Sequence, residues 1–373
     1  MKKIDGKIKI IISGGGTGGH IYPAVSIANT LKKRCPDAEI LFVGATGRME
    51  MEKVPAAGYE IVGLPIAGLQ RKFSLKNFAL PFKFVKSRMK AKKILKSFTP
   101  DVVVGVGGYA SAPTLWAAEK LNIPTLIQEQ NSFAGLTNKM LAKRAKKICV
   151  AYSGMEKFFP AEKIIFTGNP VRQDLFDVNK LRDEAFEFFN LDKSKKIVLV
   201  VGGSLGARTL NTVICKEINR INSNNIQLIW QTGKNFFAQA KNEIAYSAVK
   251  NIRVYDFIYD MNLAFAAADI IVSRAGAGTI SELCIIAKPC ILVPSPNVSE
   301  DHQTKNAMAL VNKNAAVKIS DDEAASKLID AVVQLLGDTK KMNELGENIA
   351  KLAMPDAAEK IVDEIIKLAE NEI

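Results

Sequence analysis

The sequence places a histidine at the end of a run of glycines, an arrangement that can hold an anion and move a proton. Ser13-Gly14-Gly15-Gly16-Thr17-Gly18-Gly19-His20 follows an apolar run and precedes a helical segment expected to begin near Pro23. Glycines let the backbone approach a phosphate closely, and a helix that starts after them adds unsatisfied N–H groups. The neutral imidazole of His20 is the one group in this motif that can accept a proton near pH 7. We therefore predict phosphate binding and general-base chemistry at this loop.

Three further glycine-rich segments each follow an apolar run typical of a buried strand. They are Gly105-Val106-Gly107-Gly108-Tyr109, Gly202-Gly203-Ser204-Leu205-Gly206-Ala207 and Ser273-Arg274-Ala275-Gly276-Ala277-Gly278-Thr279. One such segment alone is explained equally well by a tight turn between a strand and a helix. Four of them, two in each half of the chain, favour a polyphosphate ligand held between two domains.

Gly14, Gly16 and Gly19 also satisfy the GxGxxG spacing of dinucleotide-binding proteins. That function needs an acidic residue at the end of the second strand, where its carboxylate would hold a ribose. The second apolar run ends Val43-Gly44-Ala45-Thr46 and carries no carboxylate. An NAD-dependent oxidoreductase is therefore the weaker alternative, and a fluorescence titration with a dinucleotide separates it.

Glu282 lies four residues after Gly278, in the first turn of a helix expected to begin near Thr279. Two carboxylate oxygens there suit the vicinal hydroxyls of a ribose. The alternative is a capping acid that stabilises the helix dipole by less than about 1 kcal/mol. For the second histidine, His302 in Glu300-Asp301-His302-Gln303, a functional role and an ordinary surface or core position are equally open. The chain has no DxD pair with free surroundings at a strand end and no His/Cys cluster. We therefore expect neither a metal site nor a required cofactor. Stimulation by a divalent cation stays open.

Near-continuous apolar runs alternate with longer stretches of helical periodicity, which is typical of parallel sheets covered by helices on both faces. The pattern starts twice, because residues 7–12 and 195–201 are each followed by glycines. Proline and polar residues in Gly168-Asn169-Pro170-Val171-Arg172 close the first unit. We predict an α/β protein with two Rossmann-like, doubly wound parallel-sheet domains facing a cleft. The expected bounds are 1–172 and 173–354, followed by a C-terminal helix in 355–373 docked on the first domain.

The charge of the chain is strongly asymmetric. Its 373 residues carry a formal net charge of +13 at pH 7, and residues 1–172 alone hold 28 Lys and Arg against 11 Asp and Glu. This asymmetry favours a polyanionic partner for the first domain.

Five widely spaced cysteines argue against a disulfide framework and a structural zinc site. With no secretory signal and no apolar run of about 18 residues, we expect a soluble or peripheral protein.

Residues 71–96 concentrate much of this charge, with ten basic residues, no acidic ones and apolar residues between them. Such a surface inserts apolar side chains among lipid headgroups while its cations meet anionic lipid. A core helix with a lysine-rich outer face is the alternative. Nucleic acid is not expected, because no recognised binding motif accompanies the charge. We predict an anionic membrane surface as the partner, contacted by Phe73, Leu75, Phe78, Phe82, Lys83 and Lys86.

Together these motifs resemble the MurG family of bacterial cell-wall glycosyltransferases. The matching segments are residues 15–20, 107–109, 129–131, 134–139, 168–172, 202–204, 281–282 and 355–357. The resemblance implies a GT-B fold and inverting transfer of N-acetylglucosamine from UDP-N-acetylglucosamine to the C4 hydroxyl of the muramoyl sugar of lipid I (undecaprenyl-pyrophosphoryl-MurNAc-pentapeptide). The product would be lipid II, made in peptidoglycan synthesis. The resemblance also implies a peripheral enzyme at the cytoplasmic face of the cell membrane.

The same resemblance implies roles for individual residues. His20 is the general base of the transfer, and Ile258 meets uracil through its backbone. Glu282 holds the ribose hydroxyls of the donor. The acceptor side is lined by Gly107, Gly108 and Tyr109. The donor-binding residues are Thr17, Gly18, Gly19, Asn131, Arg172, Ser204, Ile258, Ala277, Gly278, Thr279, Ile280, Ser281, Glu282 and Gln303.

Two other classes of function fit much of this pattern. A GT-B enzyme with a different lipid or sugar acceptor would share everything except the motifs around Tyr109 and Asn131. A non-catalytic, nucleotide-sugar-binding protein of the membrane surface would bind the donor without turnover. Incubation with labelled UDP-N-acetylglucosamine and a lipid I analogue separates both from the expected transferase.

Overall fold

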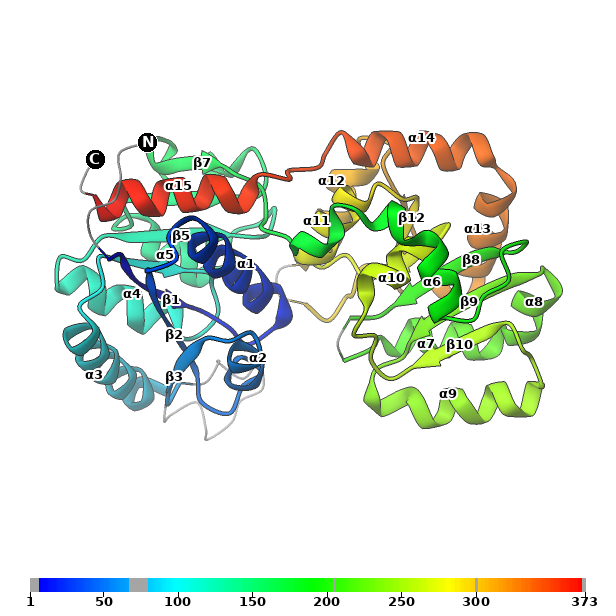
Figure 1. The fold of residues 1–373 in the computed structure, drawn as a ribbon, viewed down its shortest axis with the longest axis horizontal. Coiled ribbons are helices and arrows are strands. Elements are labelled where there is room, and N and C mark those ends of the chain that lie inside the picture. The colour runs from blue at the N-terminus through cyan, green and yellow to red at the C-terminus, as the bar shows by residue number, and fades with distance from the viewer. Residues whose placement is uncertain (1–6, 67–79, 204, 299–300, 371–373) are drawn as a thin grey trace. The chain divides into compact units, whose positions relative to one another are not determined.

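The chain folds into two compact units in the computed structural model, which describes residues 7–66, 80–203, 205–298 and 301–370. One unit comprises Met1–Val171 and Met354–Ile373, and the other comprises Arg172–Ala353. The chain therefore leaves the first unit once and returns to it for its last helix (Figure 1).

The first unit is built on a parallel sheet whose strand order, in the described part of the chain, is β3-β2-β1-β4-β5-β6-β7. The strands are β1 (Lys9–Ser13), β2 (Glu39–Ala45), β3 (Glu60–Leu64), β4 (Val102–Gly105), β5 (Thr125–Glu129), β6 (Lys147–Val150) and β7 (Ile164–Phe166). The helices are α1 (Gly18–Arg34), α2 (Glu50–Ala56), α3 (Leu80–Phe98), α4 (Ser111–Lys120), α5 (Leu136–Ala142) and α15 (Ala357–Ala369), with 3-10 turns at Met155–Lys157 and Ala161–Lys163.

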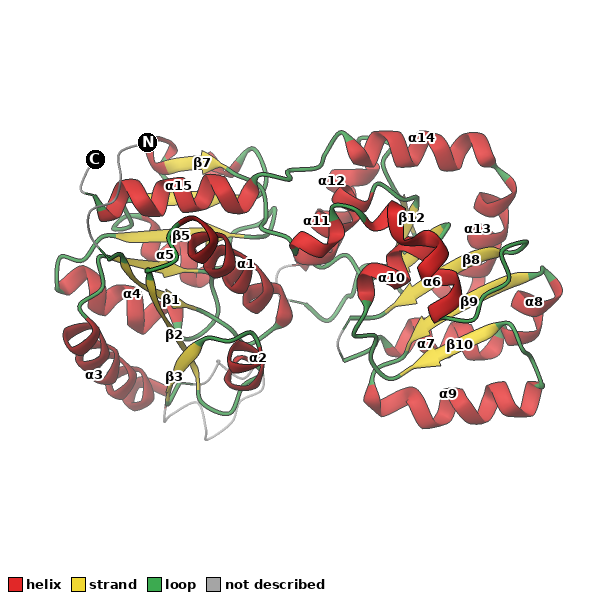
Figure 2. Ribbon diagram, viewed as in Figure 1, coloured by secondary structure: helices red, strands yellow, loops and turns green. Residues whose placement is uncertain are grey.

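Alternate residues of the central strands pack on opposite faces of this sheet, as the period of two along a strand requires. Ile10 and Ile12 share a core with apolar side chains of α1 and α15, whereas Ile11 lies in a second core with side chains of α3, α4 and α5. Figure 2 shows helices on both faces of the strands. Because both faces are covered, nearly every strand position is apolar, which explains the continuous apolar runs of the sequence.

The C-terminal helix α15 is an integral part of the first unit. Its buried residues Ile361 and Ile365 complete the core that contains the α1 side chains. At its surface, Arg34 of α1 pairs with Asp363 at 2.5 Å and with Glu359 at 3.4 Å. The last helix of the chain thus covers one face of the sheet of the first unit.

The second unit repeats the same architecture with strand order β10-β9-β8-β11-β12-β13, all parallel, among the described residues. Its strands are β8 (Lys196–Val201), β9 (Ile226–Gln231), β10 (Ile252–Tyr255), β11 (Ile270–Ser273), β12 (Cys290–Leu292) and β13 (Val317–Lys318). The α-helices are α6 (Arg182–Phe188), α7 (Arg208–Lys216), α8 (Ile218–Ser223), α9 (Lys234–Ser247), α10 (Met261–Ala267), α11 (Ala277–Ile286), α12 (His302–Val311), α13 (Ala324–Gly337) and α14 (Thr339–Ala350); 3-10 turns span Gln173–Leu175 and Val178–Leu181.

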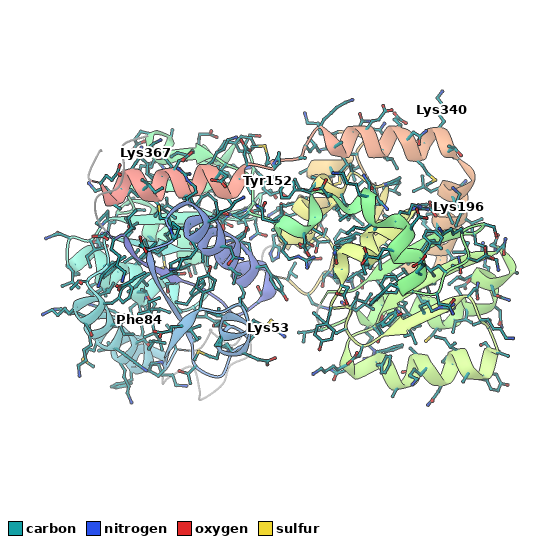
Figure 3. The ribbon with its side chains drawn as sticks, viewed as in Figure 1. Lys53, Phe84, Tyr152, Lys196, Lys340 and Lys367 are labelled. Atoms are coloured by element: carbon teal, nitrogen blue, oxygen red, sulfur yellow. The ribbon has the colours of Figure 1, made fainter. Side chains whose placement is uncertain are left out.

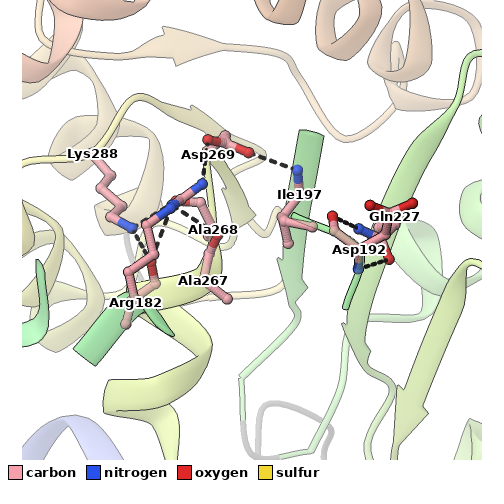
Figure 4. A network of polar contacts seen from close by, with 9 residues as sticks. Arg182, Asp192, Ile197, Gln227, Ala267, Ala268, Asp269 and Lys288 are labelled. Carbon is pink, nitrogen blue, oxygen red and sulfur yellow. Dashed lines mark hydrogen bonds and ion pairs between the residues drawn. The ribbon is translucent and has the colours of Figure 1, made fainter. Parts of the chain in front are cut away.

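A network of polar contacts connects residues at the amino-terminal edge of the second sheet (Figure 4). Asp269 accepts a hydrogen bond from the N–H of Ile197 at 2.8 Å and pairs with Arg182 at 3.0 Å. Lys288 donates to the carbonyls of Ala266 and Ala268, each at 2.7 Å. These bonds satisfy carbonyl groups at the end of α10, which have no partner within the helix itself. Burial and the neighbouring Arg182 lower the pKa of Lys288 to about 7.

In both sheets the strand order reverses at one point, between β1 and β4 and between β8 and β11. The four glycine-rich loops follow these four strands, so the prediction of two such loops in each domain, at the carboxyl ends of strands, is confirmed. Ligands of doubly wound folds bind at this reversal point, outside the carboxyl ends of the strands. The start of α1 was wrong in the prediction: the helix begins at Gly18, and Pro23 lies inside it.

Candidate active site

His20 lies in the first turn of α1, at the carboxyl edge of the first sheet. Its Nδ1 is 3.1 Å from Oγ1 of Thr17, the N-cap residue of the helix. The other side of the ring faces Gly107, where an added Cβ would lie 3.0 Å from Nε2 of His20. When Nδ1–H donates to Thr17, the lone pair is on Nε2, and that nitrogen can accept a proton. The structure therefore brings the expected base beside Gly107, one of the expected acceptor-side residues.

The two glycine loops of the first unit pack directly on each other. A Cβ on Gly108 would lie 3.0 Å from the backbone nitrogen of Gly15, so only glycine allows this approach. Ser111 at the start of α4 donates its hydroxyl to the carbonyl of Ser13 at 2.6 Å and to that of Gly107 at 3.0 Å. These contacts show that glycines serve backbone packing here, a reason additional to phosphate binding. Next to them, the side chain of Tyr109 is 44% exposed.

Asn131 is held by a buried carboxylate at the end of β5. Glu129, 1% exposed, accepts hydrogen bonds from the N–H groups of Asn131 at 3.0 Å and Gly135 at 2.9 Å, and from the side chain of Asn138 at 2.9 Å. One side chain thus fixes the loop from residue 130 to 135 and the start of α5. Thr17, Gly18, Gly19 and Asn131, all expected to bind the donor, lie in the first unit at the carboxyl edge of its sheet.

In the second unit, α11 begins at Ala277, two residues before Thr279, near which its start was expected. The first N–H groups of the helix, those of Ala277, Gly278 and Thr279, have no acceptor within it, and the dipole there favours an anion. Ile280 is the first to bond back, to the carbonyl of Gly276 at 2.9 Å. The hydroxyl of Ser281 donates a hydrogen bond to the carbonyl of Ala277 at 3.1 Å, within the same helix.

Glu282 lies in the second turn of α11, and the prediction of a first-turn position was wrong. Because the dipole effect falls off within the first turn, the capping alternative loses its main support. Its Oε1 is 3.3 Å from Nε of Arg172, the residue that opens the second unit. Burial raises the pKa of the Glu282 carboxyl, while the guanidinium of Arg172 acts in the opposite direction. Two expected donor-binding residues, 110 positions apart, therefore form one ion pair.

The backbone of Ile258 is already engaged by a side chain. Gln231, at the end of β9, accepts the N–H of Ile258 at 2.8 Å and donates to the carbonyl of Gly203 at 3.1 Å. A backbone contact from Ile258 to uracil therefore falls to its carbonyl, an acceptor suited to the N3–H of the base. Ser204, the next expected donor contact, lies outside the described residues.

Gln303 and Arg274 connect the loops that follow β11, β12 and β13. Gln303 Oε1 accepts the N–H of Ser295 at 2.8 Å and that of Ala275 at 3.3 Å. Arg274 donates to the carbonyl of Val293 at 2.9 Å and pairs with Asp321 at 2.5 Å. Gln303 is therefore bound to the glycine loop through its oxygen, which leaves its amide nitrogen as the group that could meet a sugar. His302, assigned no role, is the first residue of α12.

Helix α3 carries the described part of the expected membrane contact; Phe73, Leu75 and Phe78 lie outside the described residues. Ser87, Ala91 and Leu95 face the core, while Phe84, labelled in Figure 3, is half-buried beside Arg88. The opposite face exposes three large apolar side chains between lysines. These are Phe82 (81% exposed), Val85 and Met89, beside the exposed Lys83, Lys86, Lys90, Lys92 and Lys93.

The structural roles of three residues at the site were not predicted from the sequence. Glu50 reaches the first glycine loop from α2, and Gln231 and Arg274 each tie loops of the second unit together. Arg274 lies in one of the glycine-rich segments, but no residue spacing marks any of the three roles, because each side chain binds a backbone group that is distant in the sequence. The one available cue was their polarity at strand ends or beside glycines.

Comparisons with known proteins agree with this geometry. Residues 10–150 match the glycosyltransferase family 28 N-terminal domain, and residues 197–361 match the C-terminal domain of the same family. A relative from Bacteroides thetaiotaomicron is 58% identical over 368 residues, which cover 98% of this chain and 99% of that protein. Its name is UDP-N-acetylglucosamine--N-acetylmuramyl-(pentapeptide) pyrophosphoryl-undecaprenol N-acetylglucosamine transferase. A relative of the same name from Porphyromonas gingivalis is 54% identical over 98% of this chain and 97% of its own length.

Solved structures share the fold, and one of them belongs to the same family. The crystal structure of Acinetobacter baumannii MurG superposes with a TM-score of 0.76 at 29% identity, covering 97% of this chain and all of that one. A UDP-GlcNAc 2-epimerase from Neisseria meningitidis reaches a TM-score of 0.67 at 15% identity, over 96% of this chain and 100% of that one, and shares the fold alone. The fold is GT-B, as predicted. The chain belongs to glycosyltransferase family 28 and, within it, to the MurG family of N-acetylglucosamine transferases.

Proposed function

We propose that this chain transfers N-acetylglucosamine from UDP-N-acetylglucosamine to the C4 hydroxyl of the muramoyl sugar of lipid I, with inversion, to give lipid II. The observation that carries the proposal is identity above 50% along almost the whole chain to transferases named for this donor and acceptor. The site residues described above support it. A GT-B enzyme for a different acceptor is disfavoured, because the resemblance extends through the acceptor-side motifs.

The second unit holds the donor nucleotide. Uracil meets the carbonyl of Ile258, and the ribose hydroxyls donate to Glu282. The diphosphate lies at the N-terminus of α11, whose first N–H groups have no acceptor within the helix; these groups and the positive dipole end stabilise negative charge on the departing UDP. The pairing of Glu282 with Arg172 supports this arrangement, since it fixes the carboxylate before the ribose binds.

The first unit supplies the base. The acceptor hydroxyl attacks the anomeric carbon in a single displacement, its proton passes to Nε2 of His20, and the bond to the UDP oxygen breaks. Thr17 supports this step, because its hydroxyl oxygen, 3.1 Å from Nδ1, accepts the hydrogen of the required tautomer. Gly107, Gly108 and Tyr109 lie at the same edge of the sheet and are proposed to receive the acceptor.

The transfer is proposed to need no resident metal or cofactor. Helix-terminal N–H groups perform the charge stabilisation that a divalent ion gives in other nucleotide-sugar enzymes. This part of the proposal is tested by measuring transfer in excess EDTA and with added Mg²⁺. Retained activity in EDTA supports it, and complete loss that Mg²⁺ restores contradicts it.

The acceptor carries a polyprenyl chain, so the enzyme must meet it at a membrane. In the described ranges no helix combines the length and apolarity needed to cross one. We propose peripheral attachment at the cytoplasmic face through α3, whose exposed Phe82, Val85 and Met89 would enter the headgroup region between lysines. Anionic lipid is proposed as the partner in preference to nucleic acid, because apolar side chains alternate with the cations.

One experiment tests the central proposal. Purified protein is incubated with labelled UDP-N-acetylglucosamine and a lipid I analogue, and the lipid fraction is analysed for labelled disaccharide and its anomeric configuration by NMR. Labelled lipid with inverted configuration is expected. Donor binding without labelled lipid would support the non-catalytic alternative, and transfer only to another acceptor would support a different GT-B enzyme.

A further inference from the structure

The first glycine loop is held from behind by a buried carboxylate that no step of the proposed mechanism uses. Glu50, the first residue of α2, is 1% exposed. Its Oε2 accepts the N–H of Gly16 at 2.8 Å, and its Oε1 accepts the N–H of Ala45, at the end of β2, at 2.9 Å. A buried carboxylate is costly unless it is well bonded, and here both oxygens are used on backbone groups.

The surrounding glycines make room for this carboxylate. A Cβ on Gly15 would lie 2.7 Å from Oε2 of Glu50, and one on Gly44 would lie 2.6 Å from its Cγ. Side chains at either position would therefore displace Glu50 or the loop. Two glycines from two strand ends thus give space to the same acid, which indicates that the position of this carboxylate is built into the loop.

The bond to Gly16 acts directly on the chain segment that carries His20. Gly16 is followed by Thr17, which caps α1, lies 3.1 Å from the imidazole Nδ1, and accepts the N–H of His20 at 3.1 Å through its carbonyl. A Cβ added to Gly16 would meet no described atom within 4 Å, whereas the hydrogen bond to Glu50 restrains its backbone N–H directly. Any shift of Gly16 is passed to Thr17 and then to the imidazole.

We infer that Glu50 is a positioning residue for the transfer reaction: by binding the N–H groups of Gly16 and Ala45 it fixes the glycine loop and thereby the imidazole of His20. The inference rests on the proposed function for its kinetic part. It does not involve contact between Glu50 and either substrate. A misplacement of the base by about 1 Å is enough to reduce the rate by about 10²-fold.

The test compares Glu50→Gln with Glu52→Gln on the full chain. Glutamine has nearly the same shape but a single acceptor oxygen, so at least one of the two N–H groups loses its partner. Glu52 lies in the same helix with its side chain 81% exposed, and its substitution is the matched control. Each variant is measured for kcat and KM in transfer, for UDP affinity by calorimetry, and for amide hydrogen exchange of the segments containing Gly16 and Ala45.

For Glu50→Gln we expect faster exchange in at least one of these segments and a kcat lowered about tenfold or more, with UDP affinity within about twofold of the parent. Glu52→Gln should match the parent throughout. Unchanged exchange, or faster exchange with an unchanged kcat, would overturn the inference. So would an equal loss of UDP affinity, because that indicates general damage to the protein. If the parent itself transfers no sugar, the proposed function fails, and the exchange measurement still decides whether Glu50 holds the loop.

Discussion

Replacing Glu282 with alanine tests whether the second unit binds the ribose of the donor. The side chain is 20% exposed, and its Oε1 is already 3.3 Å from Arg172. The ribose therefore gains about one full charge-assisted hydrogen bond from this carboxylate, worth roughly 1.5–3 kcal/mol. A loss of about 2 kcal/mol weakens binding about 30-fold. Because Arg172 is itself 30% exposed, water compensates it, and little further cost is expected.

Calorimetric titration of the full chain with UDP measures this change. Glu347→Ala, an exposed acid on α14, is the matched control and should leave UDP affinity unchanged. A second titration with 2′-deoxy-UDP localises the effect: the parent should discriminate against it, and the Glu282 variant should bind the two nucleotides equally. Burial raises the pKa of Glu282. As the solution is acidified, the UDP affinity of the parent should therefore begin to fall at a pH that is still above the ordinary titration range of glutamate.

Unchanged UDP affinity in Glu282→Ala would refute the reasoning. If that variant instead lost only thermal stability, the carboxylate would be a structural partner of Arg172 and not a ligand of ribose. If the Glu282 variant still discriminated between UDP and 2′-deoxy-UDP, the conclusion would be the same, since another group would then bind the 2′-hydroxyl.

Three further predictions follow from the same geometry. His20→Ala should lower kcat by about 10²-fold or more with unchanged UDP affinity, measured by transfer kinetics and calorimetry; near-normal turnover would exclude His20 as the base. The unfolding midpoint should rise between about pH 7 and 8.5, because unfolding restores the ordinary pKa of Lys288, 10.5, and the unfolded chain then binds more protons. Lys288→Met should lack this contribution, and an identical slope in both proteins would contradict the assignment. A charge-reversal variant of α3 replaces Lys83, Lys86, Lys90 and Lys93 by Glu. It should no longer cosediment with anionic vesicles, while transfer to a water-soluble acceptor continues. Persistent vesicle binding would argue against the membrane contact.

The architecture was predictable because its signals are local. The apolar runs of β1 and β8 end at glycines, and both faces of each sheet are covered, so strand positions are apolar without interruption. Helix starts were harder to predict. Glycine has low helix propensity and proline is common in the first turn, so the sequence favoured a start at Pro23, whereas α1 begins at Gly18.

The site divides in the same way between local and distant information. His20 was found because the glycine motif and the histidine are adjacent in the chain. Glu50 acts on Gly16 from 34 positions away, and Gln231 acts on Ile258 from 27 positions away. Such contacts depend on which strand ends become neighbours in the sheet, and no residue spacing encodes that. Arg172 and Glu282 were both expected at the donor, but their direct pairing follows only from the fold.

The return of the chain to the first unit has a consequence for how the protein is made. Because α15 supplies part of the core around α1, that core stays incomplete on the ribosome until the whole of Arg172–Ala353 has been synthesised. The second unit, which is continuous in sequence, can complete its fold earlier. A chain halted shortly before α15 would expose the apolar groove vacated by Ile361, Ile365 and Leu368, and such a product is a natural target for chaperones and proteases.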